Sequence, residues 1–142
     1  MADAAPEDDK SIADDQFLYR RIFPRPDALI PVEGGYRPMS GALQDKDQAT
    51  SVDLAAECHA EDTRDRDTSQ HWHVARIPVA AVRGQQGCRV IRRPKESNPA
   101  HAVIYGKGKN GYLTDGPASN IAKQSRIFLL NPLAPAPKKL PQ

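Results

Sequence analysis

Thirteen prolines, distributed along 142 residues, keep every regular element of this chain short. Proline ends helices and cannot donate a hydrogen bond to a sheet ladder. Only 6% of the residues are aromatic, so we expect ordered structure over part of the chain. The segments between the prolines read as several strands and two short helices, too short for the crossovers of a doubly wound parallel sheet. The sequence therefore predicts a single small α+β domain with a mixed or mainly antiparallel sheet.

Composition separates two terminal tails from this domain. Residues 1–15 carry six acidic side chains and almost no large apolar one. Such a segment cannot bury enough surface to offset its ordering entropy, which predicts a disordered acidic tail. Residues 132–142 contain four prolines and two lysines, a composition typical of an extended segment. The α+β domain is therefore expected over residues 16–131.

Apolar runs bounded by turn residues are the expected strands. They cover residues 17–23, 51–54, 71–77, 88–91, 101–105 and 126–130. A helical turn is the alternative for the first run. In the second run, Val52 and Leu54 share one face of the strand, while Ser51 and Asp53 share the other.

Two short helices are expected between these strands. One covers residues 78–82 and is ended by Gly84, and the other covers residues 120–124 with Ser119 as its N-cap. The alternating charges of residues 57–70 predict a surface loop or a solvated helical turn. Arg37 follows a Gly-Gly turn and precedes a proline, which predicts a loop there.

Charge is divided unevenly along the chain. Residues 1–70 contain 16 acidic and 8 basic side chains, a balance of −8, whereas residues 71–142 contain 2 acidic and 12 basic ones, a balance of +10. The basic half predicts a patch for an acidic partner. Its cations are Arg83, Arg89, Arg92, Arg93, Lys95, Lys107 and Lys109. Stacking aromatic residues are sparse there, which favours an acidic protein over nucleic acid, and the acidic tail could occupy the same patch within the chain.

The sequence supports two hypotheses of function. The first is a small soluble non-catalytic binding or accessory protein, which engages an acidic partner through its basic C-terminal half. The alternative is an enzyme or ligand-binding domain that acts on a phosphorylated or other anionic small molecule. Arginine offers a planar fork for such anions, lysine a point charge, and histidine proton transfer near neutral pH.

The alternative assigns roles to particular residues. His101, Arg37 and Asp53 would be catalytic. The ligand-binding residues would be Arg37, Ser40, Ser51, Lys107 and Lys109. A purely structural reading pairs Arg37 with Asp53 and bonds His101 to a neighbouring backbone group.

Three segments in a fixed order resemble a known group of proteins. They are Arg-Pro-Met-Ser at 37–40, Ser-Val-Asp-Leu at 51–54, and Asn-Pro-Ala-His-Ala at 98–102 followed by Gly106-Lys107. The pattern resembles a group of small bacterial proteins without an assigned activity, and the likeness spans residues 18–132. Met39 departs from the pattern, which has serine there. The resemblance implies one compact domain and a bacterial origin.

Other motifs point more weakly to chemistry. The Gly-Lys loop at 106–111 offers amides and cations that could cradle phosphate, but it lacks the spacing of a Walker A loop and equally suits an exposed hairpin. His71 and His73, with Cys58 and His59, are poorly spaced for a metal ion. Trp72 is expected to anchor its strand, with the two flanking histidines toward solvent. No metal site or cofactor is predicted.

Localisation follows from features of the chain ends and the cysteines. No apolar run approaches the roughly 20 residues of a transmembrane helix, and residues 1–9 lack the features of a signal peptide. We therefore expect a cytoplasmic protein without a membrane partner. Cys58 and Cys88 are expected as free thiols, because cellular thiols are kept reduced.

Overall fold

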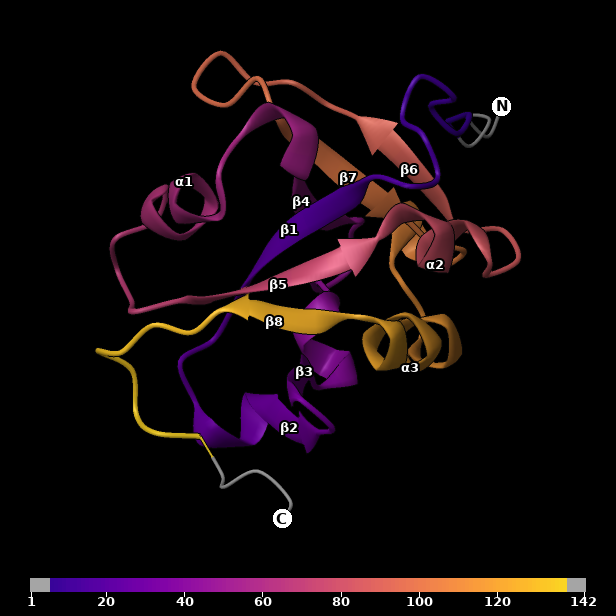
Figure 1. Ribbon diagram of the computed structural model, residues 1–142. Helices are drawn as coiled ribbons and strands as arrows, with labels where there is room; N and C mark the ends of the chain where they lie inside the picture. The colour runs from indigo at the N-terminus through magenta and orange to yellow at the C-terminus, as the bar shows by residue number, and fades with distance from the viewer. Residues whose placement is uncertain (1–5, 138–142) are drawn as a thin grey trace.

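Six short strands form one antiparallel sheet in the computed structural model, which describes residues 6–137 (Figure 1). The strand order is β6-β7-β4-β1-β5-β8, and all neighbours run antiparallel. The strands are β1 (Phe17–Ile22), β4 (Thr50–Leu54), β5 (His73–Pro78), β6 (Arg89–Arg92), β7 (His101–Tyr105) and β8 (Arg126–Leu129). The α+β prediction is confirmed, and all six expected runs form strands.

Three helices accompany the sheet: α1 (Ala60–Asp65), α2 (Val79–Arg83) and α3 (Asp115–Gln124). Gly84 ends α2, as expected. The second expected helix was placed too late: α3 begins after Thr114, and Ser119 lies inside it. Its early start is possible because Pro117 falls in the first turn, where a missing N–H costs little. Within residues 6–137, no helix has both the length and the apolar character needed to cross a membrane.

A separate hairpin places Arg37 in a strand. Strands β2 (Leu29–Val32) and β3 (Gly35–Pro38) pair with each other, and Arg37 lies opposite Ile30. The prediction of a loop at Arg37 is therefore wrong. The hairpin tolerates its prolines because a two-stranded ribbon consists only of edge strands, and Gly34 turns the chain at a φ of 81°.

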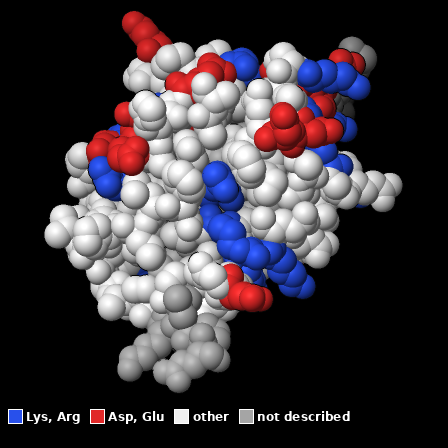
Figure 2. Space-filling model, in the orientation of Figure 1, with Lys and Arg blue, Asp and Glu red and all other residues white. Residues whose placement is uncertain are grey.

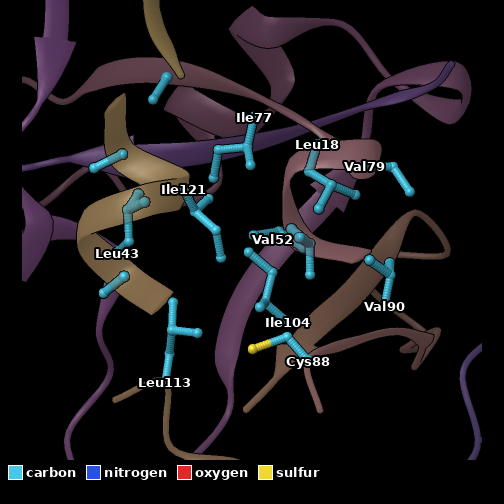
Figure 3. Close-up of a cluster of buried hydrophobic side chains, with 14 of the residues drawn as sticks. Leu18, Leu43, Val52, Ile77, Val79, Cys88, Val90, Ile104, Leu113 and Ile121 are labelled. Carbon is cyan, nitrogen blue, oxygen red and sulfur yellow. The ribbon is translucent and has the colours of Figure 1, made fainter. Parts of the chain in front are cut away.

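An aliphatic core fills the space between the sheet and the helices α2 and α3 (Figure 3). Alternate residues of each strand point to this face, as period-two strand geometry requires. Buried side chains from the sheet and α3 meet there: Leu18, Val52, Ile77, Val90, Ile104 and Ile121. The opposite face carries Ser51 and Asp53, and α1 contacts it through the hydrogen bond between Thr63 and Asp53.

The N-terminal residues do not form a free tail. Residues 6–15, hereafter the acidic segment, are docked on the domain, and residues 6–9 of this segment lie beside the edge strand β6. The Asp9 N–H donates to the Val90 carbonyl over 2.9 Å, and the Val90 N–H donates to the Asp8 carboxylate over 2.9 Å. Ile12 is fully buried in the core. The disordered tail predicted over residues 1–15 is thus replaced by a docked segment in 6–15, while residues 1–5 lie outside the described chain.

Arginines of the basic half hold the acidic segment in place. Arg83 forms ion pairs with Asp14 at 2.7 Å and Asp8 at 3.1 Å, and Arg92 lies 3.7 Å from Asp9. Figure 2 shows acidic and basic side chains adjoining near the N-terminus, at the upper right. The acidic segment therefore occupies part of the basic patch within the chain. At the other end, residues 132–137 contain no helix or strand, and residues 138–142 of the expected extended tail are not described.

His73 is buried, contrary to the expectation that it faces solvent. It is 1% exposed, its Nδ1 accepts a hydrogen bond from the Asn131 N–H at 2.9 Å, and its Nε2 has no partner within the described chain. The strand begins only at His73, so exposed His71 does not share a strand face with it. Trp72 is buried, as expected of an anchor.

We expect His73→Gln to reduce the dependence of the free energy of unfolding on pH between pH 7.5 and 5. Burial lowers the pKa of His73 below its ordinary 6.5, so the unfolded chain takes up a proton that the folded chain refuses. Stability therefore falls as the pH drops below 6.5, by up to about 1.4 kcal/mol per pH unit for one proton. Urea unfolding between pH 7.5 and 5 measures this slope. His71→Gln is the control, and an unchanged slope in His73→Gln would refute the assignment.

Candidate functional site

A break in the sheet creates a polar cleft. Strands β1 and β4 pair at only two positions, and the Arg20 side chain takes the place of further pairing. Its guanidinium donates to the carbonyls of Ser51 and Ala42, each at 2.9 Å, and pairs with Asp45 at 3.0 Å. The Ser51 N–H donates to Asp45 at 2.8 Å. The side chains of Arg20 and Asp45 thus bind the backbone C=O and N–H of Ser51 in place of strand β1. The strands β1 and β4 separate beside Ser51.

The resulting cleft has a volume of about 450 Å³ and a positive lining. Its cations are Arg20, Arg21, Arg66 and Lys95, and its carboxylates are Asp45 and Asp53. A pocket of this size is within the range that holds small-molecule ligands. The excess of cations favours an anionic ligand.

Two of these cations form ion pairs within residues 6–137, and two do not. Arg20 pairs with Asp45, and Arg66 pairs with Asp53 at 3.0 Å. Arg21 and Lys95 form no ion pair within residues 6–137. Arg21 instead donates to the Thr63 carbonyl at 3.3 Å. Arg21 and Lys95 are therefore the cations available to an anion.

Asp53 is the buried anchor beneath this cleft. Its carboxylate accepts hydrogen bonds from Thr63 Oγ1 and Asn98 Nδ2, both at 2.7 Å, and from Arg66 Nε at 3.0 Å. Burial alone would raise the pKa of Asp53, but these hydrogen bonds outweigh burial and hold the pKa below its usual value. With its oxygens occupied, the Asp53 carboxylate joins β4 to α1 and to the loop before β7, a positioning role.

Ser51 and His101 form a polar pair at the wall of the cleft. His101 Nδ1 lies 2.9 Å from the Arg93 carbonyl, which can only accept, so Nδ1 carries the proton. In the neutral ring, Nε2 then accepts from the Ser51 hydroxyl at 3.3 Å. Burial is the main cause that lowers the pKa of His101, which keeps the ring neutral at pH 7. A hydroxyl beside an oriented neutral imidazole has the arrangement of an acid–base pair.

The structure brings together only some of the residues singled out from the sequence. Ser51, Asp53 and His101 meet at the cleft, because β4 and β7 are neighbours and Asp53 pairs with His101. Arg37 donates to the Pro38 carbonyl from the separate hairpin, and the cation paired with Asp53 is Arg66. The remaining predicted ligand-binding residues are not part of the cleft lining: Arg37, Ser40, Lys107 and Lys109.

The Gly-Lys loop closes on itself. The Gly106 N–H donates to the Gly111 carbonyl at 2.7 Å, and the Gly108 N–H donates to the Tyr112 carbonyl at 2.9 Å. The Gly111 N–H is likewise taken by the Gly108 carbonyl at 3.0 Å. These three glycine amides are therefore not free to bind phosphate.

Metal and cysteine chemistry receive little support from the described residues. Across residues 6–137, no three His, Cys, Asp or Glu side chains gather closely enough to hold a metal ion. Cys58 is half-buried, Cys88 is buried, and both are free thiols. Burial is the main cause that raises the pKa of each thiol, so neither is activated as a nucleophile.

Residues missed from the sequence complete the site. Arg20, Arg21, Arg66, Lys95 and Asn98 come from three separate segments, and no spacing joins these segments. The one available signal was the pair Arg20-Arg21 inside an apolar strand, where adjacent charges need partners on both faces.

Comparisons with protein-family models, with curated proteins and with solved structures find no match. The function is therefore inferred from the chemistry of the residues that line the cleft.

Proposed function

We propose that this protein binds an anionic small molecule, phosphorylated or carboxylated, in the cleft between β1 and β4. The observation that carries the proposal is the presence of Arg21 and Lys95 in a polar cleft, without a carboxylate partner within residues 6–137. Arginine and lysine bind phosphate and carboxylate groups through charge-assisted hydrogen bonds. A cytoplasmic location, expected from the sequence, would expose the cleft to phosphorylated metabolites.

The Ser51–His101 pair adds an acid–base function to this proposal. If the bound molecule reacts, His101 is the residue that accepts a proton, because its Nε2 faces the Ser51 hydroxyl. Arg37 has no place in this proposal, since it lies on the hairpin. Asp53 has a positioning role, because its carboxylate holds Thr63, Arg66 and Asn98 in place at the cleft.

An acidic protein partner is the second candidate function. The acidic segment already contacts Arg83, Arg89 and Arg92. An acidic partner would bind the basic surface through contacts of the same kind. The partner hypothesis is therefore restricted to cations that the acidic segment does not contact: Arg93, Lys95, Lys107 and Lys109.

Pyrophosphate and citrate serve as probes of the proposed cleft. We expect at least one of them to bind in isothermal titration calorimetry, and Arg21→Gln to weaken that binding by about tenfold or more, the value of one charge-assisted hydrogen bond. Lys95→Gln should weaken binding as well. Lys109→Gln removes the same charge outside the cleft and should leave the affinity unchanged.

The results distinguish binding of the anion in the cleft from a general attraction of the anion to a positively charged protein. Equal weakening by Lys95→Gln and Lys109→Gln would mean that the anion responds to overall charge, and the cleft proposal fails. Failure of the unaltered protein to bind either probe would also overturn it. Thermal melting of each variant verifies that Arg21→Gln, which loses the Thr63 hydrogen bond, still folds.

A further inference from the structure

The phenylalanines and the tryptophan of this chain lie outside its main core cluster. The core cluster is aliphatic, with Tyr36 as the one ring packed against it among the described residues. The chain has three phenylalanines and one tryptophan, and all four lie on or beside the sheet face opposite the core: Phe17, Phe23, Trp72 and Phe128. Phe23 is 49% exposed and Phe128 is 50% exposed. Phe23 and Phe128 are therefore rings on this face that another molecule can reach.

Two of these rings form one end of the cleft. Phe23 and Trp72 both line it, and their ring centroids lie 5.0 Å apart. The Arg21 guanidinium lies over the Trp72 ring, 5.6 Å from its centroid. Half of Phe23 is accessible, so a flat ring can stack on it without displacing the protein. Planar groups with delocalised electrons are the ligands that such surfaces bind well.

The other end of the cleft is polar. Lys95, Asn98 and His101 line it, from β7 and the loop before β7. In the sheet, β7 is separated from β5, which follows Trp72, by β4 and β1. Three strand spacings of about 4.8 Å place roughly 14 Å between these two strands. The cleft is therefore elongated, with aromatic rings at one end, polar groups at the other and Arg21 between them on β1.

We infer that the ligand of this cleft is a nucleotide, an inference that rests on the proposed function and specifies its substrate class. The base stacks on Phe23 beside Trp72, and the phosphate lies toward Arg21 and Lys95. A simple anion such as pyrophosphate would leave the aromatic end unused. The volume of about 450 Å³ suits one small ligand more than a strand of nucleic acid.

The test compares two ligands that carry the same phosphate. Ribose 5-phosphate lacks a base, whereas AMP, GMP, CMP and UMP add one. Base stacking on an aromatic side chain is worth a factor of about 5 to 150 in affinity. We expect at least one nucleoside monophosphate to bind at least about fivefold tighter than ribose 5-phosphate. Trp72 is the single tryptophan, so a stacked base should also change the intrinsic fluorescence of the protein.

Matched variants locate the base. Phe23→Leu keeps an apolar side chain and should remove the affinity gap between nucleotide and ribose 5-phosphate, while the affinity for ribose 5-phosphate stays unchanged. Phe128→Leu alters an equally exposed phenylalanine outside the cleft and should preserve the gap. Ribose 5-phosphate binding as tightly as all four nucleotides would overturn the nucleotide inference and leave anion binding intact. A gap that survives in Phe23→Leu would overturn the placement of the base.

Discussion

Ile12→Ala is expected to destabilise the domain by about 2 to 5 kcal/mol, the usual cost of emptying a fully buried isoleucine site. Ile12 has no exposed surface and belongs to the main core cluster. The composition of the acidic segment predicts that its deletion leaves the stability of the domain unchanged. The burial of Ile12 predicts instead that the fold depends on this segment. The free energy of unfolding in urea measures the change.

Leu133→Ala is the control for this substitution. Leu133 is 71% exposed, so its truncation should leave the unfolding midpoint close to that of the unaltered protein. If Ile12→Ala behaved like Leu133→Ala, the acidic segment would not be docked in solution. An intermediate loss with an altered denaturant slope would instead report a change in the surface exposed on unfolding.

Asp53→Asn is expected to cost about 3 to 5 kcal/mol, because it leaves a partly buried arginine without its counter-charge. The carboxylate receives hydrogen bonds from Thr63, Asn98 and Arg66, and an amide can accept through only one atom. Since the pKa of Asp53 is lowered in the folded state, its contribution is fully present above the ordinary value of 3.8 and is lost as the pH falls further.

The matched control for Asp53 is Asp65→Asn. Asp65 also pairs with an arginine, Arg64, at 2.7 Å, but its side chain is 61% exposed, and exposed pairs contribute little. The urea midpoint at pH 7 should therefore fall strongly in Asp53→Asn and hardly at all in Asp65→Asn. Equal midpoints in the two variants would show that burial does not strengthen the Asp53 network.

The strands were predictable because their information is local. Alternation in residues 51–54 separates Val52 from Ser51 and Asp53 without knowledge of any neighbour, and the same faces appear in the structure. The sequence predicts a helix that starts after Ser119, whereas α3 starts after Thr114 and holds Pro117 in its first turn, where proline is accepted. Local sequence patterns therefore predict that a helix or strand exists more reliably than they predict its first and last residues.

The site was only half predictable because it depends on strand order. Ser51, Asp53 and His101 were candidates for their chemistry, and the β4–β7 pairing joins them. No sequence spacing indicates that β1 lies beside β4, so Arg20 and Arg21 were not grouped with them. The same limit applies to the acidic segment, whose contacts with β6 join residues about eighty positions apart.

Those contacts also bear on how copies of this chain behave toward one another. β6 ends the six-stranded sheet, and an open edge strand is a template on which a second chain can add its own strand. The backbone of Asp9 and the carboxylate of Asp8 occupy both hydrogen-bonding groups of Val90, and the aspartates add negative charge along that border. The acidic segment therefore closes this edge at Val90, and its ion pairs with Arg83 and Arg92 satisfy within one molecule charges of opposite sign that would otherwise attract a neighbouring copy.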